Sequence, residues 1–450
     1  MFENNFKNAI RPTDEFTRLN DYEIRSIFME YDGGGRVDLK TLFQNITINE
    51  DINHSAISGS ILIKDTTQLL NSFPISGHEK IVIEFRTPGI GSDFISSVFR
   101  VVQVNDRVRG PNDRTEVYRI NFISESAFVS KLNKISKSYK GTISDIVSQV
   151  HSEFFETKIS TDKTNGEYRF VIPYWTPLKV MEWLSMRAIP ANKRSETNFL
   201  FFETMRGHNF KCLSELNSKD SVIEYTKRPV SQRQMDSGPS HQQQFTTIQE
   251  LQIFKTNQKL EETMDGAFAS SLLQHDVTTK SWSRTNFNYN NEIKKIRTTS
   301  PEKVLTSNSV YAKNPNAFIN LTTKQQQLMG KDYPNTQNHE EWFQQALSSR
   351  TLLDTIKIKI NVSGNSALSV GDNVNVFVPK TGEITKNNSE WYDKQLSGKY
   401  MIISLRHTIT QDDYVTTMML GKSGYEVGLP DVSTFMGTDN NKQTNILETR

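Results

Sequence analysis

Apolar and polar residues alternate along the first part of the chain with the two-residue period of a half-buried strand. The alternating apolar positions between residues 39 and 124 include Ile46, Ile48, Ile61, Ile63, Ile81, Ile83, Phe85, Tyr118, Ile120 and Phe122. Gly, Asn, Pro and Asp residues separate these runs, as turns require. The segment TTQLLNSFPISG predicts a short helical turn that ends at Pro74. Several short strands at this spacing predict a first antiparallel β-barrel over residues 1–130.

A helical period replaces the strand period in residues 131–197. From Ser144 to Phe155 the apolar residues recur every four positions, which places them on one helix face. Thr176 followed by Pro177 is typical of a helix start, because it combines an N-cap with proline at the first helical position. These patterns predict an α/β insert. The apolar cluster of its second helix is Met181, Trp183, Leu184 and Met186, whose spacing indicates core packing rather than a cofactor site.

The stretch richest in apolar bulk is NFLFFETMRGHNFKCLSEL, residues 198–216. Two strand-like runs flank a turn whose glycine can adopt positive φ, so a β-hairpin is predicted. Its apolar core, Phe199 to Phe202, is far shorter than the roughly 20 residues of a transmembrane helix. Cys212, the single cysteine, is expected to be a packing residue rather than a nucleophile. The hairpin is expected to start a second barrel, and its side chains either fill that core alone or also pack against the insert.

The two-residue period returns near the end of the chain. Its apolar positions are Ile356, Ile358, Ile360 and Val362, then Val374, Val376 and Val378, before the strand-like runs SGKYMIISLRHTI and DYVTTMML. Residues 198–230 with 351–422 are therefore predicted to form a second, discontinuous β-barrel. Together with the insert, this predicts a β-rich α+β fold with two antiparallel β-barrels and α/β inserted domains.

The remaining segments are polar. Residues 230–248 are rich in Gln and Ser, which predicts a linker or exposed loop. This loop opens a polar mixed α/β region over 231–350, with local order expected in MDGAFASSLLQHDV and in HEEWFQQALSSRTLLD, where Trp342 to Ala346 have helical spacing. Residues 423–450 are predicted to be an extended C-terminal tail.

Composition limits the classes of partner. Lys and Arg number 53 and Asp and Glu 51, so a net charge of +2 leaves no broad cationic field for nucleic acid or anionic lipid. Hydrophobic residues make up 35% of the chain, below the usual globular share of about 45–50%, which indicates much polar surface. With one cysteine and no apolar segment of signal-peptide length at its start, the chain is expected to fold in a cytoplasm, without stable membrane insertion.

Two motifs resemble catalytic signatures but lack an essential residue. His339 begins a run like the zinc-protease helix HExxH, yet Phe343 stands where the second histidine must coordinate the metal. Gly421-Lys422-Ser423 resembles the end of a phosphate loop, but Thr416 replaces the leading glycine and no helix pattern follows. Neither motif predicts a site.

Ligand motifs fail in the same way. The calcium-loop-like segment 162–166 has Pro173 at the position of the bidentate glutamate, and Gly89 and Gly91 lack the third glycine of a dinucleotide turn. The histidines are His54, His78, His151, His208, His241, His275, His339 and His407, and none stands three or four residues from another. Hydrolysis by a dispersed triad or by paired carboxylates has no positive support. We expect no enzyme, and no catalytic, cofactor-binding or metal-binding residue is predicted.

Several segments, taken in order, resemble the central hub protein of contractile-tail phage baseplates, of which the protein of T-even phages is the best-known member. These segments are residues 58–89, 136–147, 198–216, 266–282, 340–379 and 396–409. Residues 283–339 and those after 428 match no part of that pattern. The resemblance implies that both β-barrels are of the tail-tube type.

The resemblance also implies a structural role in the virion. Three copies would form a hollow hub that joins the cell-puncturing spike, a tail lysozyme-like needle, to a tail-tube initiator or tube protein, with tape-measure protein and genomic DNA in the lumen. Two similar barrels per chain would give this homotrimer a nearly sixfold face. One alternative is a carbohydrate-binding or envelope-degrading β-barrel protein of the tail. Another is a nucleic-acid-binding module, against which the charge balance argues.

Overall fold

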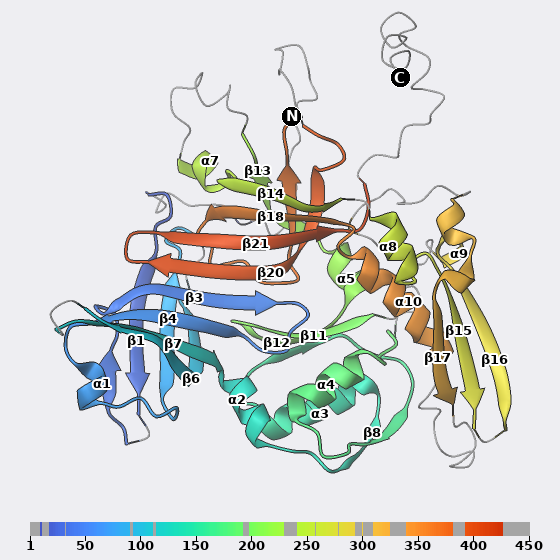
Figure 1. Cartoon of the computed structure of the whole chain (residues 1–450), viewed down its shortest axis with the longest axis horizontal. Helices are drawn as coiled ribbons and strands as arrows, with labels where there is room; N and C mark the ends of the chain where they lie inside the picture. The colour runs from blue at the N-terminus through green and yellow to red at the C-terminus, as the bar shows by residue number, and fades with distance from the viewer. Residues whose placement is uncertain are drawn as a thin grey trace, which may run out of the picture.

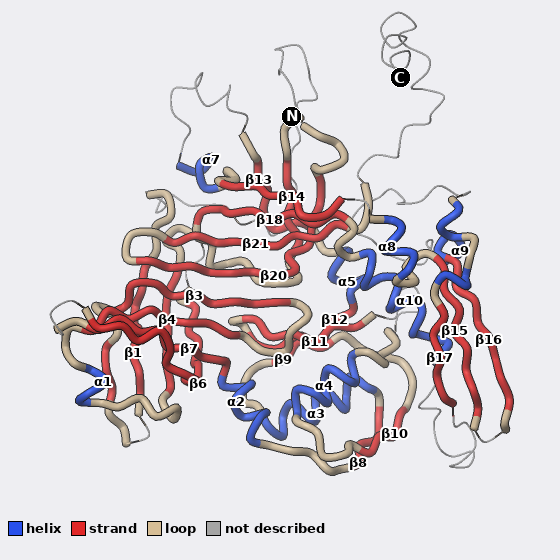
Figure 2. Tube along the Cα trace, in the orientation of Figure 1, coloured by secondary structure: helices blue, strands red, loops and turns tan. Residues whose placement is uncertain are grey.

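The computed structural model describes residues 10, 18–31, 33–90, 93–110, 114–191, 198–228, 241–256, 258–277, 279–292, 299, 309–324, 339–380 and 392–425. Within them the protein is mostly antiparallel β-sheet with few helices (Figure 1, Figure 2). A 13-stranded sheet occupies the upper and left parts of Figure 1, a helical insert lies below it, and a three-stranded sheet lies at the right. The predicted β-rich class is confirmed.

The first half of the large sheet contains the strands predicted between residues 39 and 124. Its order is β3-β4-β7-β6-β5-β1-β2, with antiparallel pairs throughout. The bounds are β1 Glu23–Glu30, β2 Arg36–Asp38, β3 Phe43–Asp51, β4 Ser58–Asp65, β5 Lys80–Arg86, β6 Ile95–Arg109 and β7 Glu116–Ser124. Alternate side chains such as Ile46, Ile61 and Ile120 are fully buried in one core. The predicted helical turn before Pro74 is α1, Leu69–Ser72.

The second half contains the strands predicted from the later alternation. The bounds are β13 Ser221–Thr226, β14 Glu250–Thr256, β18 Ile356–Ser363, β19 Asn373–Phe377, β20 Gly398–Thr410 and β21 Tyr414–Lys422. The path β14-β18-β21-β20 is antiparallel, and β19 pairs with β20 on one side and in parallel with β13 on the other. Ile358, Val374 and Leu405 are fully buried in a second core, as their alternation predicts.

Part of the region expected to be polar belongs to this second half. β14 lies within residues 231–350 but pairs with β18. The prediction of an exposed loop over 230–248 is wrong at its end, where α7 (His241–Phe245) begins and both Phe245 and Ile248 are fully buried. These two side chains anchor the segment in the second core, which the Gln-rich composition around them concealed. Residues 229–240 lie outside the described residues.

The two halves are joined by hydrogen bonds between β3 and β20. These strands pair in antiparallel register from Asp51 opposite Ser404 to Asn45 opposite Thr410. One continuous sheet therefore runs from β14 at one edge to β2 at the other. Among the described strands, no strand-to-strand ladder closes either half into a ring, although a parallel bridge between Thr226, at the end of β13, and Thr247 connects β13 to the segment just before β14.

The insert contains the two predicted helices. Its elements are α2 Glu125–Leu132, β8 Ser138–Gly141, α3 Ile143–Phe154, β9 Ile159–Thr161, β10 Tyr168–Val171 and α4 Pro177–Ser185. Thr176 is the N-cap residue of α4 and Pro177 its first residue, as predicted. Met181 and Leu184 are fully buried in the insert core, whereas Met186, expected to pack with them, is 44% exposed because α4 ends at Ser185.

The predicted hairpin is formed by β11 (Phe199–Thr204) and β12 (Gly207–Cys212) and is followed by α5, Leu213–Ser218. At the turn Gly207 has φ 122°, and an added Cβ would lie 2.5 Å from the carbonyl oxygen of Lys158, so glycine is required. β12 pairs in parallel with β9 of the insert. The hairpin therefore belongs to a separate three-stranded sheet, a correction to the expectation that it starts the second barrel.

Both faces of this hairpin are buried. Phe199 and Phe201 pack in the insert core, while Leu200 and Phe202 pack in the core of the second half of the large sheet. The side chains alternate between faces because the period of a strand is two residues. Of the two packing arrangements left open by the sequence, the structure has the one that joins two cores. Cys212 is buried on the insert side, as expected for a packing residue.

A small unit at the right of Figure 1 contains the other helices and strands that the structure describes in the polar region. Its elements are α8 Lys259–Met264, β15 Ala269–Asp276, β16 Ser281–Asn288, α9 Tyr289–Glu292, the 3₁₀ turns η2 Val310–Ala312 and η3 Pro315–Ala317, β17 Ile319–Lys324 and α10 His339–Leu352. The strand order is β16-β15-β17. Local order is confirmed for both predicted segments, the first as β15 and the second as the helix α10.

The start of the predicted C-terminal tail is not extended. Ser423 and Tyr425 are buried, and the backbone N–H of Thr299 donates to the Ser423 hydroxyl at 3.2 Å. Residues 426–450, the rest of the predicted tail, lie outside the described residues. Among the described helices, none is long and apolar enough to cross a membrane.

Candidate functional site

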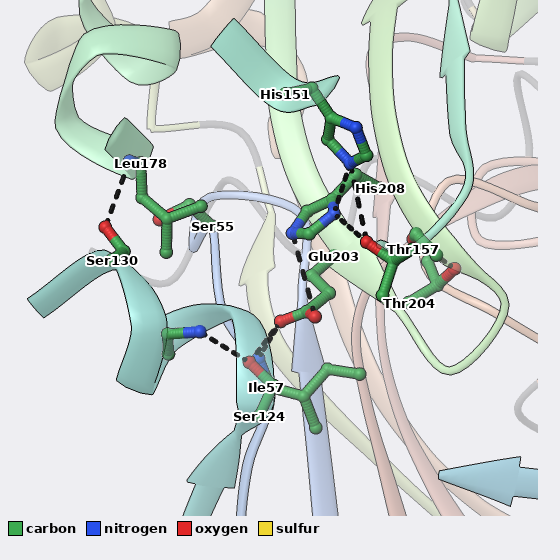
Figure 3. Close-up of polar contacts among 12 residues, drawn as sticks. Ser55, Ile57, Ser124, Ser130, His151, Thr157, Leu178, Glu203, Thr204 and His208 are labelled. Atoms are coloured by element: carbon green, nitrogen blue, oxygen red, sulfur yellow. Dashed lines mark hydrogen bonds and ion pairs between the residues drawn. The ribbon is translucent and has the colours of Figure 1, made fainter. Parts of the chain in front are cut away.

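A cluster of buried polar side chains lies where the hairpin meets the first half of the large sheet and the insert (Figure 3). Glu203 comes from β11, His208 from β12, Ser124 from the end of β7 and His151 from α3. No two of these elements are close enough in sequence to meet except the two arms of the hairpin. The cluster is therefore made by the tertiary fold.

Glu203 is the acid of this cluster and is only 5% exposed. Its Oε2 accepts hydrogen bonds from the backbone N–H of Ile57 at 3.0 Å and from the Ser124 hydroxyl at 2.5 Å. Burial raises the pKa of Glu203 to about 7, although these hydrogen bonds favour the carboxylate and oppose the shift. A single side chain of the hairpin thus connects the loop before β4 and the end of β7.

His208 lies directly opposite Glu203 in the hairpin register. Its Nδ1 is 3.1 Å from Nε2 of His151 and 3.0 Å from the hydroxyl of Thr157, whereas its Nε2 is 3.7 Å from Oε1 of Glu203, too far for a hydrogen bond. Burial lowers the pKa of His208 to about 3, with a smaller contribution from His151, whose own pKa burial also lowers. Both imidazoles are therefore neutral near pH 7.

The geometry of the cluster differs from that of a hydrolytic triad. In a triad the histidine accepts the proton of the serine and the acid orients the histidine. Here the Ser124 hydroxyl donates to Glu203, and the nearest hydrogen-bond partners of His208 are His151 and Thr157. The serine proton has no histidine to receive it. These hydrogen bonds connect the hairpin to the first half of the sheet through Glu203 and to the insert through His208.

A second buried acid makes a similar connection. Glu50, at the end of β3, is fully buried and accepts from the backbone N–H of Met205 at 2.9 Å and of Val370 at 3.2 Å. Burial raises its pKa to about 7. Glu50 therefore links the first half of the sheet to the hairpin turn and to the loop before β19. The two glutamates together fix the hairpin against both halves.

Lys422 and Asp162, residues of two of the incomplete motifs, have hydrogen-bond partners within the chain. The side chain of Lys422 is fully buried, and its Nζ donates to the backbone carbonyl oxygens of Gln395 at 3.1 Å and Ser397 at 2.6 Å. Asp162 bonds Nζ of Lys211 at 2.8 Å and the backbone N–H of Cys212 at 3.0 Å. Within the described residues, no group of three or more His, Cys, Asp or Glu side chains could hold a metal ion.

Sequence reasoning missed Glu50, Glu203 and His208 as a set. One signal was available for Glu203, because a carboxylate that directly continues the apolar run Phe199–Phe202 on a buried strand must find hydrogen-bond donors. The identity of those donors, Ile57 and Ser124, depends on contacts between residues 146 and 79 positions apart. No local pattern carries that information.

Comparison with known proteins relates the fold to tail proteins. No protein-family model and no curated protein sequence matches the chain. The structure is similar to the tail protein from Neisseria meningitidis MC58, with a TM-score of 0.52 and 11% identity over 91% of this chain and 99% of that one. It is also similar to the 43 kDa tail protein of prophage MuSo2 from Shewanella oneidensis, with a TM-score of 0.50 and 11% identity over 89% and 99%. The chain therefore has a fold found in tail proteins, one of them from a prophage.

Proposed function

We propose that this protein is the structural hub subunit of a contractile-tail baseplate, a trimeric ring that joins the spike to the tail tube. The observation that carries the proposal is the β3–β20 pairing, which unites two β-rich halves of one chain edge to edge. Two joined halves are what a threefold ring needs to offer a nearly sixfold face to a tube. The likeness in fold to two tail proteins supports the same role.

The ring would be completed by the free edges of the sheet. Among the described strands, β14 and β2 end the path and each has one unpaired edge. We propose that β14 of one copy meets the β1–β2 edge of the next, which repeats between chains what β3 and β20 do within one. Ile253 and Phe254 on β14 are about half exposed in the single chain, as residues of such a contact would be. The two halves would then complete their barrels in the assembled trimer.

The first test is the mass of the particle in solution. Light scattering should give three times the chain mass, and Phe254→Asp, which places a charge at the β14 edge, should give a monomer that keeps the circular dichroism spectrum of the unchanged protein but unfolds at a lower temperature, because it lacks the contacts of the ring. Leu132→Asp is the matched control, because Leu132 is 70% exposed at the end of α2 on the insert. Monomer mass for the unchanged protein at every concentration, with and without the spike protein, would refute the ring.

The second test concerns the partners. Co-expression with the spike gene of the same phage should yield a stable complex with equal numbers of both chains, since permanent contacts of this kind usually bury more than about 2,000 Å². Co-expression with the tube initiator should also give a complex, in which the initiator binds the opposite rim of the ring. A complex that falls apart at moderate salt would contradict the hub role, and release of sugar from peptidoglycan by the purified protein would contradict a purely structural one.

A further inference from the structure

A cavity of about 460 Å³ separates the insert from the three-stranded sheet β16-β15-β17. Phe170 of β10 and Trp183 of α4 line it on the insert side, and three consecutive residues of β17, 321 to 323, line it on the other. His339, the first residue of α10, lies at the same cavity. None of these residues belongs to the Glu203 cluster.

Arg187, just after α4, is the cation of this cavity. Its guanidinium stacks on the ring of Trp183, with Cζ 4.1 Å from the ring centroid, and Nη1 donates to the backbone carbonyl of Trp183 at 3.1 Å. In the part of the chain that the structure describes, no carboxylate forms an ion pair with it. Burial lowers the pKa of Arg187 to about 10. A partly buried cation without a counter-ion is costly, so its place beside a cavity calls for an anion from outside the described chain.

The edge of β17 supplies the second half of the site. β17 pairs with β15 on one side, and no described strand pairs with its other edge. Side chains of consecutive strand residues point to opposite faces, so a cavity lined by residues 321, 322 and 323 borders the edge of the strand rather than one face. The hydroxyl of Thr322 is buried without a hydrogen-bond partner, and Leu321 is 62% exposed. An open edge with these features accepts an extended chain.

We propose that this cavity binds an extended acidic peptide of a partner protein, which adds to β17 as a strand and places one carboxylate on Arg187. A carboxylate fits better than a phosphate, because Arg187 is the only Lys or Arg side chain among the described residues that line the cavity. The planar guanidinium fork matches the two oxygens of a carboxylate. Apolar side chains of the same peptide would cover Leu321 and the ring of Phe170.

The test uses the full chain and the peptide acetyl-Thr-Val-Thr-Glu-Val-amide, with binding followed by titration calorimetry. The Glu peptide should bind roughly tenfold more tightly than the same peptide with Gln, since one charge-assisted hydrogen bond is at stake. Arg187→Met should abolish this tenfold preference. Thr322→Val should weaken the binding of both peptides by a few-fold. This variant tests the proposal even if Arg187→Met folds poorly.

Lys179→Met is the matched control. Lys179 also stacks on a tryptophan, with Nζ 5.1 Å from the ring centroid of Trp175, but it does not line the cavity. This variant should bind both peptides as the unchanged protein does. Equal affinity for the Glu and Gln peptides, or no binding of either at millimolar concentration, would overturn the proposal. Tighter binding of a phosphoserine version would overturn the carboxylate assignment, and acetate that competes with the same affinity as the peptide would overturn strand addition.

Discussion

Two ionisable side chains, the buried Glu203 and the partly buried Arg187, differ in how completely the described residues satisfy them. Glu203 accepts two hydrogen bonds from the first half of the sheet, and its burial leaves it near the midpoint of its titration at neutral pH. Arg187 has aromatic faces and one backbone carbonyl but no acid within the described residues. A buried ionisable group with hydrogen-bond partners stabilises a contact between parts of the same molecule. One without a counter-ion indicates a contact with another molecule.

The largest expected effect is the loss of the satisfied site. Glu203→Ala leaves the N–H of Ile57 and the Ser124 hydroxyl without their acceptor and opens a void, so the free energy of unfolding should fall by about 2–4 kcal/mol. Chemical denaturation of both proteins at pH 6 measures the change. The control is Glu261→Ala on the exposed side of α8, which should shift the free energy by less than about 0.5 kcal/mol.

The pH dependence of the same site comes next. The pKa of Glu203 is about 7 in the folded protein, against an ordinary value of 4.5, so the stability that it contributes is fully present below pH 4.5 and is lost as the pH rises through 7. Glu203→Gln keeps an acceptor but cannot ionise. Relative to the variant, the unchanged protein should lose on the order of 2 kcal/mol between pH 5 and pH 8. Only the difference between the two proteins is diagnostic, because Glu50 titrates in the same range and His208 contributes stability that is lost as the pH falls from 6.5 towards 3.

Ser124 should show a smaller effect. Its hydroxyl donates to Glu203 and also accepts from the backbone N–H of Ala127 as the N-cap of α2. Ser124→Ala should lower the free energy of unfolding by about 1–2 kcal/mol. In the Glu203→Ala background the same change should cost less, because the shared hydrogen bond is already absent. A double-mutant cycle gives this coupling, and strict additivity would show that the serine acts only as a cap.

Arg187 should show the smallest effect and the opposite sign. Arg187→Met removes a cation that nothing in the described chain neutralises, so the free energy of unfolding should stay unchanged or rise by up to about 1 kcal/mol. Arg100 is the matched control, since its guanidinium also lies over an aromatic ring, Phe128, but bonds both oxygens of Glu125. Arg100→Met should destabilise the protein. If both variants lost a similar free energy of unfolding, the proposed difference between Arg187, which lacks a counter-ion, and Arg100, which has one, would be wrong.

Local patterns in the sequence predicted the elements well. The alternation at Ile356–Val362 gave a strand because one face of it is buried, and Thr176-Pro177 marked the start of α4 because its cap chemistry is local. The hairpin followed from its glycine turn. These predictions rest on interactions that span only a few residues.

Arrangement in space could not be predicted in the same way. The partner of β12 is β9 of the insert, and nothing in either strand specifies the other. Phe245 and Ile248 are buried in the second core, but the Gln-rich composition around them predicted an exposed loop. The Glu203 cluster and the Arg187 cavity each need three or more elements in place, so their residues stand out only after the chain has folded.

The β3–β20 pairing also determines when during translation the large sheet can be completed. Nε of Arg406 on β20 donates to Oδ1 of Asn49 on β3, across 357 residues of chain. At translation rates of about 5–20 residues per second, the edge of β3 waits on the order of half a minute for its partner to leave the ribosome. During that time an unpaired strand with buried positions Ile46 and Ile48 is available to other nascent chains. Slow codons between the two strands should therefore lower the yield of native protein, and a ribosome-associated chaperone should restore it.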